Sequence, residues 1–375
     1  MRKVKILISG GGTGGHVFPA IAIADALKRR IPDVDILFVG ARGRMEMEKV
    51  PLAGYPIKGL WISGFQRRLT AKNLLFPFKL VFSLMQAALI VRRFRPDVAI
   101  GVGGYASGST MKMAARNKVP VVLQEQNSYP GITNKLMAKT ADVICVAYEG
   151  MEKYFPKEKL VITGNPVRQN VIEIKGKKNA ALEYFELDKN KLVVLVVGGS
   201  QGARSINESI DKNLELLAMS DLQVIWQTGK FYTDRARKAI LEKVNGNKKN
   251  SMRVEEFITR MDYAYAAASI VISRAGAIAI SELSAVGKPC ILIPLPSAAE
   301  DHQTQNALAL AEKDAAIHLK DTDAAEELGR IIIRLAKDEE RRNILAENIK
   351  KMAVHNSANQ IADEVIKLIG KEHAA

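Results

Sequence analysis

A glycine-rich segment near the start of the chain has residue types and spacing that suit anion binding. Residues 8–24 read ISGGGTGGHVFPAIAIA, and Gly10, Gly12 and Gly15 fit the dinucleotide spacing G-x-G-x-x-G. A glycine turn between a strand and a helix leaves backbone N–H groups uncovered at the positive end of the helix dipole. A nicotinamide dinucleotide also needs an acidic residue about 20 residues further on for its ribose. The next strand ends FVGARGR (38–44) with no acid before Glu46, which argues against NAD, and Arg42 supports NADP only weakly.

His16 directly follows this loop, at the expected start of a helix over residues 16–30. The helix dipole disfavours a charged imidazolium at that position, and a neutral imidazole can act as a general base. A capping or packing role explains the position of His16 equally well.

Two later segments are also candidates for ligand binding. GGSQGAR (198–204) offers the hydroxyl of Ser200 and exposed amides that could hold a pyrophosphate, although tight strand-to-helix packing would explain the same glycines. ISRAGAIAISELSAVGKP (272–289) predicts a helix from about Gly276 to Gly287. Glu282 lies within it, and a carboxylate can accept both vicinal hydroxyls of a ribose. A solvent-facing Glu282 is the simpler alternative.

The elements that must position these residues alternate between apolar strands and amphipathic helices. Strands are expected at 4–10, 35–40, 97–104, 119–126 and 141–147, and the pattern restarts with strand, glycine loop and helix at 191–210. Further strands are expected at 222–229, 251–257, 269–276 and 289–295. Such alternation predicts βαβ units and parallel sheets. The fold class is therefore α/β with two doubly wound halves, which divide within LVITGNPVRQNVIE (160–173).

Composition limits the classes of function. The 375 residues include 47% hydrophobic and 25% charged residues and only two cysteines, as expected for a globular protein of a reducing cytoplasm. The start of the chain does not read as a signal peptide. The net charge of +15 suits anionic partners. Aromatic residues are only 6%, and no nucleic-acid-binding module is recognisable, so a nucleic-acid partner is not expected.

The D-x-D segments at 33–35 and 321–323 are interpreted as surface features, and no metal site is expected.

Residues 66–95 read QRRLTAKNLLFPFKLVFSLMQAALIVRRFR, which combines crowded apolar side chains with basic residues and no acid. The apolar part is too short for the roughly 20 residues of a spanning helix. Such a segment suits a surface that rests on an anionic bilayer, and a core helix with a basic outer face is the alternative.

Taken in order, several motifs together resemble one family. They are GGGTGGHVFPA (10–20), GVGGYASG (101–108), EQN (125–127), GNPVR (164–168), GGSQGAR (198–204), EFI (256–258), SRAGAIAISE (273–282) and HQTQNA (302–307). The set is similar to the MurG family, the bacterial N-acetylglucosaminyltransferases of peptidoglycan synthesis. The resemblance spans nearly the whole chain, and the set is specific although no single motif is.

The resemblance implies a GT-B fold, in which two Rossmann-like domains face a cleft. It places an acceptor- and membrane-binding domain at 1–164 and a UDP-sugar-binding domain at 165–351, with a final helix at about 352–375 that packs back on the first domain. It implies inverting transfer of N-acetylglucosamine from UDP-N-acetylglucosamine to the C4 hydroxyl of lipid I, which gives lipid II. No cofactor is expected. The expected location is the cytoplasmic face of the cell membrane, in peripheral contact with anionic lipids of the inner leaflet.

The family's site residues carry over by position. The donor set implied is Thr13, Gly14, Gly15, Asn127, Arg168, Ser200, Ile258, Ala277, Ile278, Ala279, Ile280, Ser281, Glu282 and Gln303. The first loop would hold the acceptor pyrophosphate, with Gly11, Gly12, Gly103, Gly104 and Tyr105. His16 becomes the leading candidate for the catalytic base, and Glu125 competes with it. Membrane contact is expected at Leu75, Phe76, Phe78, Lys79 and Phe82.

One departure from the family is visible, and two other functions stay open. The family commonly has His before EQN, where this chain has Gln124, so a catalytic part for position 124 is weakened. A GT-B enzyme that glycosylates another lipid or a small aglycone is one alternative. A UDP-sugar epimerase of similar architecture is the other, and it would release UDP without an acceptor.

Overall fold

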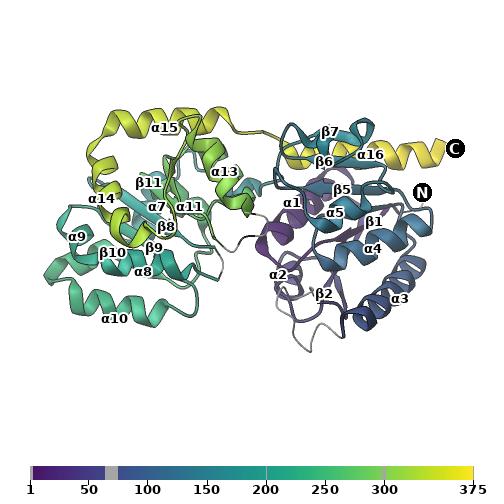
Figure 1. Cartoon of the computed structure of the whole chain (residues 1–375), viewed down its shortest axis with the longest axis horizontal. Coiled ribbons are helices and arrows are strands. Elements are labelled where there is room, and N and C mark those ends of the chain that lie inside the picture. The colour runs from purple at the N-terminus through teal and green to yellow at the C-terminus, as the bar shows by residue number, and fades with distance from the viewer. Residues whose placement is uncertain (1–2, 64–74, 200, 297, 299–300, 375) are drawn as a thin grey trace. The chain divides into compact units, whose positions relative to one another are not determined.

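The structure is a computed structural model that describes residues 3–63, 75–199, 201–296, 298 and 301–374. The chain forms two compact units, Met1–Arg168 with Val354–Ala375, and Gln169–Ala353 (Figure 1). The sequence predicted boundaries after residues 164 and 351. The structure divides the chain after residues 168 and 353 instead, so residues 165–168 belong to the first unit and residues 352 and 353 belong to the second.

The first unit contains a parallel sheet of seven strands in the order β3-β2-β1-β4-β5-β6-β7. Its elements are β1 (Lys5–Ser9), α1 (Gly14–Arg30), β2 (Asp35–Ala41), α2 (Glu46–Leu52), β3 (Ile57–Leu60), α3 (Phe76–Phe94), β4 (Val98–Gly101), α4 (Tyr105–Arg116), β5 (Val121–Glu125), α5 (Ile132–Met137), β6 (Val143–Val146) and β7 (Leu160–Ile162). The final helix, α16 (Ser357–Ala374), also belongs to this unit.

The two faces of the first sheet bury different sets of apolar residues. Side chains alternate along a strand, and Ile6 and Ile8 of β1 pack in the cluster formed with α1 and α16. Leu7 faces the other cluster, formed with α3 and α4. Helix α16 adds Ile361 and other apolar residues to the α1 side, so the C-terminal helix is part of the core of the first unit (Figure 1).

The second unit contains a parallel sheet of six strands in the order β10-β9-β8-β11-β12-β13. Its elements are α6 (Gln169–Ile172), α7 (Lys178–Tyr184), β8 (Val193–Val197), α8 (Arg204–Lys212), α9 (Leu214–Met219), β9 (Gln223–Gln227), α10 (Thr233–Lys243), β10 (Met252–Glu255), α11 (Met261–Ala267), β11 (Ile270–Ser273), α12 (Ala277–Val286), β12 (Cys290–Leu292), α13 (His302–Ala311), β13 (Ile317–His318), α14 (Ala324–Lys337) and α15 (Glu339–Lys351).

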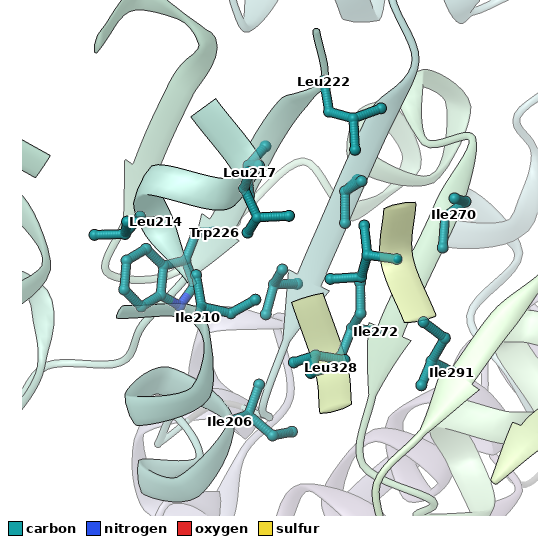
Figure 2. Packing of buried hydrophobic residues seen from close by; sticks show 14 of the residues in the cluster. Ile206, Ile210, Leu214, Leu217, Leu222, Trp226, Ile270, Ile272, Ile291 and Leu328 are labelled. Atoms are coloured by element: carbon teal, nitrogen blue, oxygen red, sulfur yellow. The ribbon is translucent and has the colours of Figure 1, made fainter. Parts of the chain in front are cut away.

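One face of this second sheet is covered by α8, α9, α10 and α14. Figure 2 shows part of the cluster, with Ile206 and Ile210 from α8 and Leu328 from α14 around the strands. Trp226 of β9 is buried there, and its indole N–H donates to the side-chain oxygen of Asn207 at 3.0 Å. Buried apolar strands with helices on both faces are the pattern expected of parallel sheets.

Candidate functional site

The first candidate site lies where the strand order of the first sheet reverses, between β1 and β4. In open parallel sheets, ligands bind beyond the carboxyl ends of the strands at such a point. The loop of residues 10–13 follows β1 and the loop of residues 102–104 follows β4, and they lead into α1 and α4. Neither helix has an acidic residue in its first turn, so the positive end of each dipole is not neutralised from within the helix.

Gly104 shows how closely these two loops pack. Its φ is +89°, and a Cβ atom built on it would lie 2.5 Å from the carbonyl oxygen of Gly11. Gly12 and Gly103 also have positive φ values, +89° and +97°. The glycines expected around the acceptor pyrophosphate are therefore gathered where the two loops meet, and Tyr105 begins α4 beside them with an exposed side chain.

His16 lies in the first turn of α1 with its ring against the second loop. Its Nδ1–H donates to the Gly11 carbonyl oxygen at 3.0 Å, because a carbonyl can only accept. In the neutral ring Nε2 is then an acceptor. A Cβ atom at Gly103 would lie 2.8 Å from that Nε2, so glycine leaves room for the ring. Burial lowers the pKa of His16 below its ordinary value, while Glu125, the Gly11 carbonyl and Glu46 act in the opposite direction. A neutral imidazole with Nε2 unprotonated is the form that a general base needs.

Glu125, the competing candidate, ends β5 and is buried. Its Oε1 accepts the backbone N–H of Asn127 at 3.0 Å and the Asn127 side-chain amide at 3.1 Å. Its Oε2 accepts the N–H of Gly131 at 3.1 Å and the side-chain amide of Asn134 at 2.9 Å. Four donors surround this carboxylate, so it organises the loop after β5 and adds negative charge near His16. These four hydrogen bonds indicate a structural role for Glu125, and His16 stays the leading candidate for the base.

The polar residues next to Glu125 form a buried network. The Gln124 side-chain amide donates to the Asn165 side-chain oxygen at 3.3 Å, and Asn165 donates to the Gln126 carbonyl at 3.1 Å. Gln126 donates in turn to the Val102 carbonyl at 2.9 Å, next to the second glycine loop. Gln124, where the family commonly has His, is thus a buried structural residue that ties residue 165 to β5.

Glu46 is a residue of this site that the sequence analysis did not identify. It begins α2 and is fully buried, and its Oε2 accepts the Gly12 N–H at 2.9 Å while its Oε1 accepts the Ala41 N–H at 2.9 Å. A Cβ atom at Gly11 would lie 2.2 Å from Oε1, and one at Gly40 would lie 2.5 Å from Cγ. Two glycines therefore make the space for one carboxylate. The sequence signal that could have pointed to Glu46 was the pair of glycines at 11 and 40, which the fingerprint G-x-G-x-x-G does not require.

Three more residues of the expected donor set lie near the start of α1. Thr13 is the N-cap residue, and its carbonyl accepts the N–H of His16 at 3.1 Å. Thr13 and Gly15 are exposed, and Gly14 is partly exposed.

Arg168, another member of the expected donor set, ends the first unit. The centre of its guanidinium lies 4.5 Å from the ring centroid of Phe18 on α1, a cation–π contact within that unit. Its buried Nε has no hydrogen-bond partner among the described residues. Arg168 is therefore positioned by the first unit, although its motif was assigned to the second domain.

The second candidate site lies where the strand order of the second sheet reverses, between β8 and β11. Ser200 falls outside the described residues. Gly202 has φ +76°, and a Cβ atom on it would lie 2.0 Å from the Thr228 carbonyl oxygen, so this loop packs directly on the end of β9. Gln227, the last residue of β9, joins this loop to Ile258. Its Nε2 donates to the Gly199 carbonyl at 3.0 Å, and its Oε1 accepts the Ile258 N–H at 2.9 Å. Gln227 is a second residue that the sequence analysis missed.

Ile258 and the residues expected on α12 divide into two groups. The side chains of Ile258, Ala277 and Ile280 are buried in the core, so only their backbone could meet a ligand. Ile278, Ala279, Ser281 and Glu282 are partly exposed, on a helix that begins after Gly276 and has no acidic residue in its first turn.

Glu282 and Gln303 have defined partners in the second unit. The buried Tyr265 of α11 donates its hydroxyl to Glu282 Oε2 at 2.9 Å, which orients that carboxylate. Gln303 Oε1 accepts the Leu295 N–H at 3.0 Å. Both side chains are held by the unit itself.

Arg274 ties the ends of several strands of the second sheet together. It donates to the carbonyls of Ile293 and Pro294 at 3.1 and 3.0 Å, to the Asp321 carboxylate at 2.5 Å and to the Ser205 hydroxyl at 2.6 Å. Asp321 of the second D-x-D segment is partly buried and pairs with Arg274, whereas Asp323 is exposed, as expected of a surface segment. Among the described residues, no group of three or more His, Cys, Asp or Glu side chains could hold a metal ion.

Helix α3 presents the surface expected to meet a membrane. Its buried residues, Ser83, Ala87 and Val91, form a narrow seam at helical spacing. The outward residues that we call the α3 surface are Leu75, Phe78, Phe82, Met85 and Leu89, which are 49–64% exposed. Phe76 is partly buried, and Lys79 donates to the Ser63 hydroxyl at 2.9 Å.

The bases at 67, 68 and 72 lie outside the described residues. Within the described part of the chain, every helix is too short or too polar to cross a membrane.

The exposed Trp61 borders the α3 surface and was not anticipated. Its ring makes an edge-on contact with Phe82, with a centroid separation of 5.6 Å. Lys79 lies 5.8 Å from the centroid of the same ring. A tryptophan beside a lysine is a pairing that suits an interface between apolar and aqueous phases.

The two parallel sheets, each with a glycine loop at the point of strand reversal, have the architecture of the GT-B type. Residues 6–146 match the glycosyltransferase family 28 N-terminal domain and residues 193–365 match the glycosyltransferase family 28 C-terminal domain. A relative from Parabacteroides distasonis, called UDP-N-acetylglucosamine--N-acetylmuramyl-(pentapeptide) pyrophosphoryl-undecaprenol N-acetylglucosamine transferase, is 54% identical over 99% of this chain and 100% of its own. The chain belongs to this family of transferases, within glycosyltransferase family 28.

Solved structures agree with that assignment. MurG of Acinetobacter baumannii, 25% identical, matches with a TM-score of 0.74 over 98% of this chain and 100% of its own. A UDP-GlcNAc 2-epimerase from Neisseria meningitidis, bound to UDP-GlcNAc, matches with a TM-score of 0.66 at 15% identity over 97% of this chain and 100% of its own. The second likeness concerns the fold alone.

Proposed function

We propose that this enzyme transfers N-acetylglucosamine from UDP-N-acetylglucosamine to the C4 hydroxyl of lipid I, the undecaprenyl-pyrophosphoryl N-acetylmuramyl peptide, and so forms lipid II. The name of the relative from Parabacteroides distasonis supports both substrates. The observation that carries the mechanism is the hydrogen bond from His16 Nδ1 to the Gly11 carbonyl, which leaves Nε2 as the acceptor of a neutral ring beside two interlocked glycine loops. A base and an anion cradle in one place suit a hydroxyl acceptor that carries a pyrophosphate.

In the proposed reaction, the C4 oxygen of the acceptor forms a bond to the anomeric carbon of the donor sugar. The bond from that carbon to the phosphate oxygen breaks at the same time, which inverts the configuration. The hydroxyl proton passes to His16 Nε2, and UDP leaves with the electron pair. The starts of α1 and α4 and the loop amides other than that of Gly12, which Glu46 accepts, hold the acceptor pyrophosphate, since backbone N–H groups at helix starts bind anions.

The second unit supplies the donor site in this proposal. The start of α12 and the loop after β8 meet the diphosphate, Glu282 accepts the ribose hydroxyls, and Gln303 contacts the sugar. Fixed dipoles can stabilise the charge that develops on UDP. No cofactor has a part in this scheme. Dialysis against EDTA is expected to leave the rate unchanged, and loss of activity that Mg²⁺ restores would contradict this part of the scheme.

We also propose that the enzyme binds peripherally to the cytoplasmic face of the cell membrane through the α3 surface. Apolar side chains beside Lys79, on a chain with a net charge of +15, suit anionic lipids. Phe78→Ser/Phe82→Ser is expected to reduce co-sedimentation with phosphatidylglycerol vesicles. Leu241→Ser, an equally exposed residue of α10, is the control. Equal binding of both variants would exclude the α3 surface.

The decisive experiment measures transfer of labelled N-acetylglucosamine to a lipid I analogue, beside a reaction without acceptor. Acceptor-dependent transfer with inversion is expected, and His16→Gln should lower kcat by a factor of roughly 10² to 10⁴ while donor affinity is kept. UDP release without acceptor would favour the epimerase. Transfer only to other lipids would favour a related lipid glycosyltransferase.

A further inference from the structure

Glu46 and His16 are joined through a single peptide group. The Gly12 N–H donates to Glu46 Oε2 at 2.9 Å, and the Gly11 carbonyl accepts the His16 Nδ1–H at 3.0 Å. The Gly11 carbonyl and the Gly12 N–H belong to the same peptide bond. A buried carboxylate therefore binds one end of a conjugated amide, and the imidazole binds the other end.

A peptide group can carry polarisation between two such partners. Its resonance shifts electrons from nitrogen to oxygen, and hydrogen bonds in a chain strengthen one another. A carboxylate that accepts the N–H draws that proton and so increases the negative charge on the carbonyl oxygen. The carbonyl then becomes a better acceptor for the His16 Nδ1–H, and the positive charge that His16 gains with a proton at Nε2 is stabilised.

We propose that Glu46 is a positioning residue that orients His16 and increases its basicity through the peptide bond between Gly11 and Gly12. No proton crosses the amide. Glu46 stays ionised, the Gly12 N–H stays intact, and only Nε2 gains and loses a proton. The inference deepens the proposed function, since it gives His16 the support that a catalytic base needs, but the relay itself can be observed without any substrate.

The space for this arrangement is built into the sequence. Any side chain at Gly11 or Gly40 would collide with Glu46, and any side chain at Gly103 would collide with the His16 ring. Glu46 is fully buried and also accepts the Ala41 N–H at 2.9 Å, so its carboxylate is fixed from the β2 side as well. The three glycines and the carboxylate form one packed unit around the peptide group.

The effect of Glu46 on His16 must be distinguished from the effects of the other charged groups nearby. Glu125 on β5 also favours the charged imidazole, whereas burial opposes it. Elsewhere on α1, Asp25 accepts the Tyr55 hydroxyl and Arg30 pairs with Asp363 of α16. Arg168 lies over Phe18 in the next turn. Among the charged groups that the structure describes, only Glu46 is linked to the ring through the Gly11–Gly12 peptide, so a change confined to Glu46 tests the relay.

The test uses the full chain labelled with ¹⁵N-histidine. Five histidines are present, and His16→Gln identifies the signal of His16. In the unchanged protein, the Nδ1–H tautomer should dominate above the pKa of His16. In Glu46→Gln, that pKa should fall and the Nε2–H tautomer should increase. Glu48→Gln, an exposed change on the same helix, should alter neither.

Kinetics provide the second readout. Glu46→Gln should lower kcat roughly tenfold, less than the loss of the base itself, and move the acidic limb of the kcat profile to lower pH with the donor KM unchanged. An unchanged His16 pKa and tautomer in Glu46→Gln would overturn the relay. If that variant does not fold, an Nε2–H tautomer in the unchanged protein would overturn it equally. A relay seen by NMR together with full activity of His16→Gln would reject the base role alone and leave the relay intact.

Discussion

The hydrogen bond from Tyr265 to Glu282 allows a direct test of the donor site. Tyr265 is buried on α11, and its hydroxyl lies 2.9 Å from Glu282 Oε2. Tyr265→Phe removes one oxygen atom and leaves the ring in place. If Glu282 binds the ribose of the donor, loss of this bond should leave the carboxylate less well oriented. The donor KM should then rise while kcat is kept, because the interaction is equal in the ground state and the transition state.

The size of this effect follows from the charge on Glu282. Hydrogen bonds to charged groups contribute roughly 1.5–3 kcal/mol. The lower end applies here, since a partly exposed carboxylate can recover some solvation, and about 1.4 kcal/mol corresponds to tenfold in affinity. We therefore expect the donor KM to rise by a factor of about ten. Initial rates over a range of UDP-N-acetylglucosamine concentrations, at saturating acceptor, measure it. Calorimetric titration of UDP provides an independent value.

Two further variants make the test specific. Tyr263→Phe on the same helix keeps the edge-on contact with Tyr184 and should leave the donor KM unchanged. Adding Tyr265→Phe to Glu282→Ala should raise KM no further, because the tyrosine acts through the carboxylate. Fully additive effects, or an unchanged KM in Tyr265→Phe, would refute the assignment of Glu282 to the ribose.

Three other changes have outcomes that the structure determines. Gly104→Ala combines a positive φ with a contact to the Gly11 carbonyl and should lower the free energy of unfolding by roughly 2–4 kcal/mol in urea titration. Burial and Lys178 lower the pKa of Lys288 from 10.5 to about 8, so the charged form costs about 3 kcal/mol below pH 8. The free energy of unfolding should rise between pH 8 and 10.5, and Lys288→Met should abolish the rise. Glu125→Gln replaces one acceptor oxygen with an NH2 donor that faces the surrounding donors, and it should cost about 3 kcal/mol, seen as a lower Tm.

The central strands of both sheets were predictable from the sequence, whereas three edge strands were not. β1 and β8 are continuous apolar runs followed by glycine loops. The strand expected at 4–10 contains β1, and the strand, loop and helix expected at 191–210 contain β8. The strands that were missed, β3, β7 and β13, each lie at the edge of a sheet and have two to four residues. Edge strands are commonly short and less apolar. Their pairing depends on the neighbouring strand rather than on their own composition.

The residues of the candidate site also divide into those that were predictable from the sequence and those that were not. Its glycines and His16 were found because backbone geometry and helix starts leave a local pattern. Glu46 and Gln227 were missed because each acts on a loop more than 25 residues away in the sequence. Glu125 was a plausible base by its type alone, and only the four donors around its carboxylate indicate a structural role.

The two glycine loops differ in the group that holds them, and the difference matches the chemistry proposed for each. The first is held by a carboxylate, since Glu46 accepts the Gly12 N–H. The second is held by a neutral amide, since Gln227 donates to the Gly199 carbonyl and takes no N–H from residues 198–203 among the described contacts. In the proposed reaction, the carboxylate beneath the first loop supports His16, which becomes positively charged when it takes the acceptor proton, and amides other than that of Gly12 would hold the acceptor pyrophosphate. We therefore expect proton transfer in the first unit and stabilisation of the leaving group in the second.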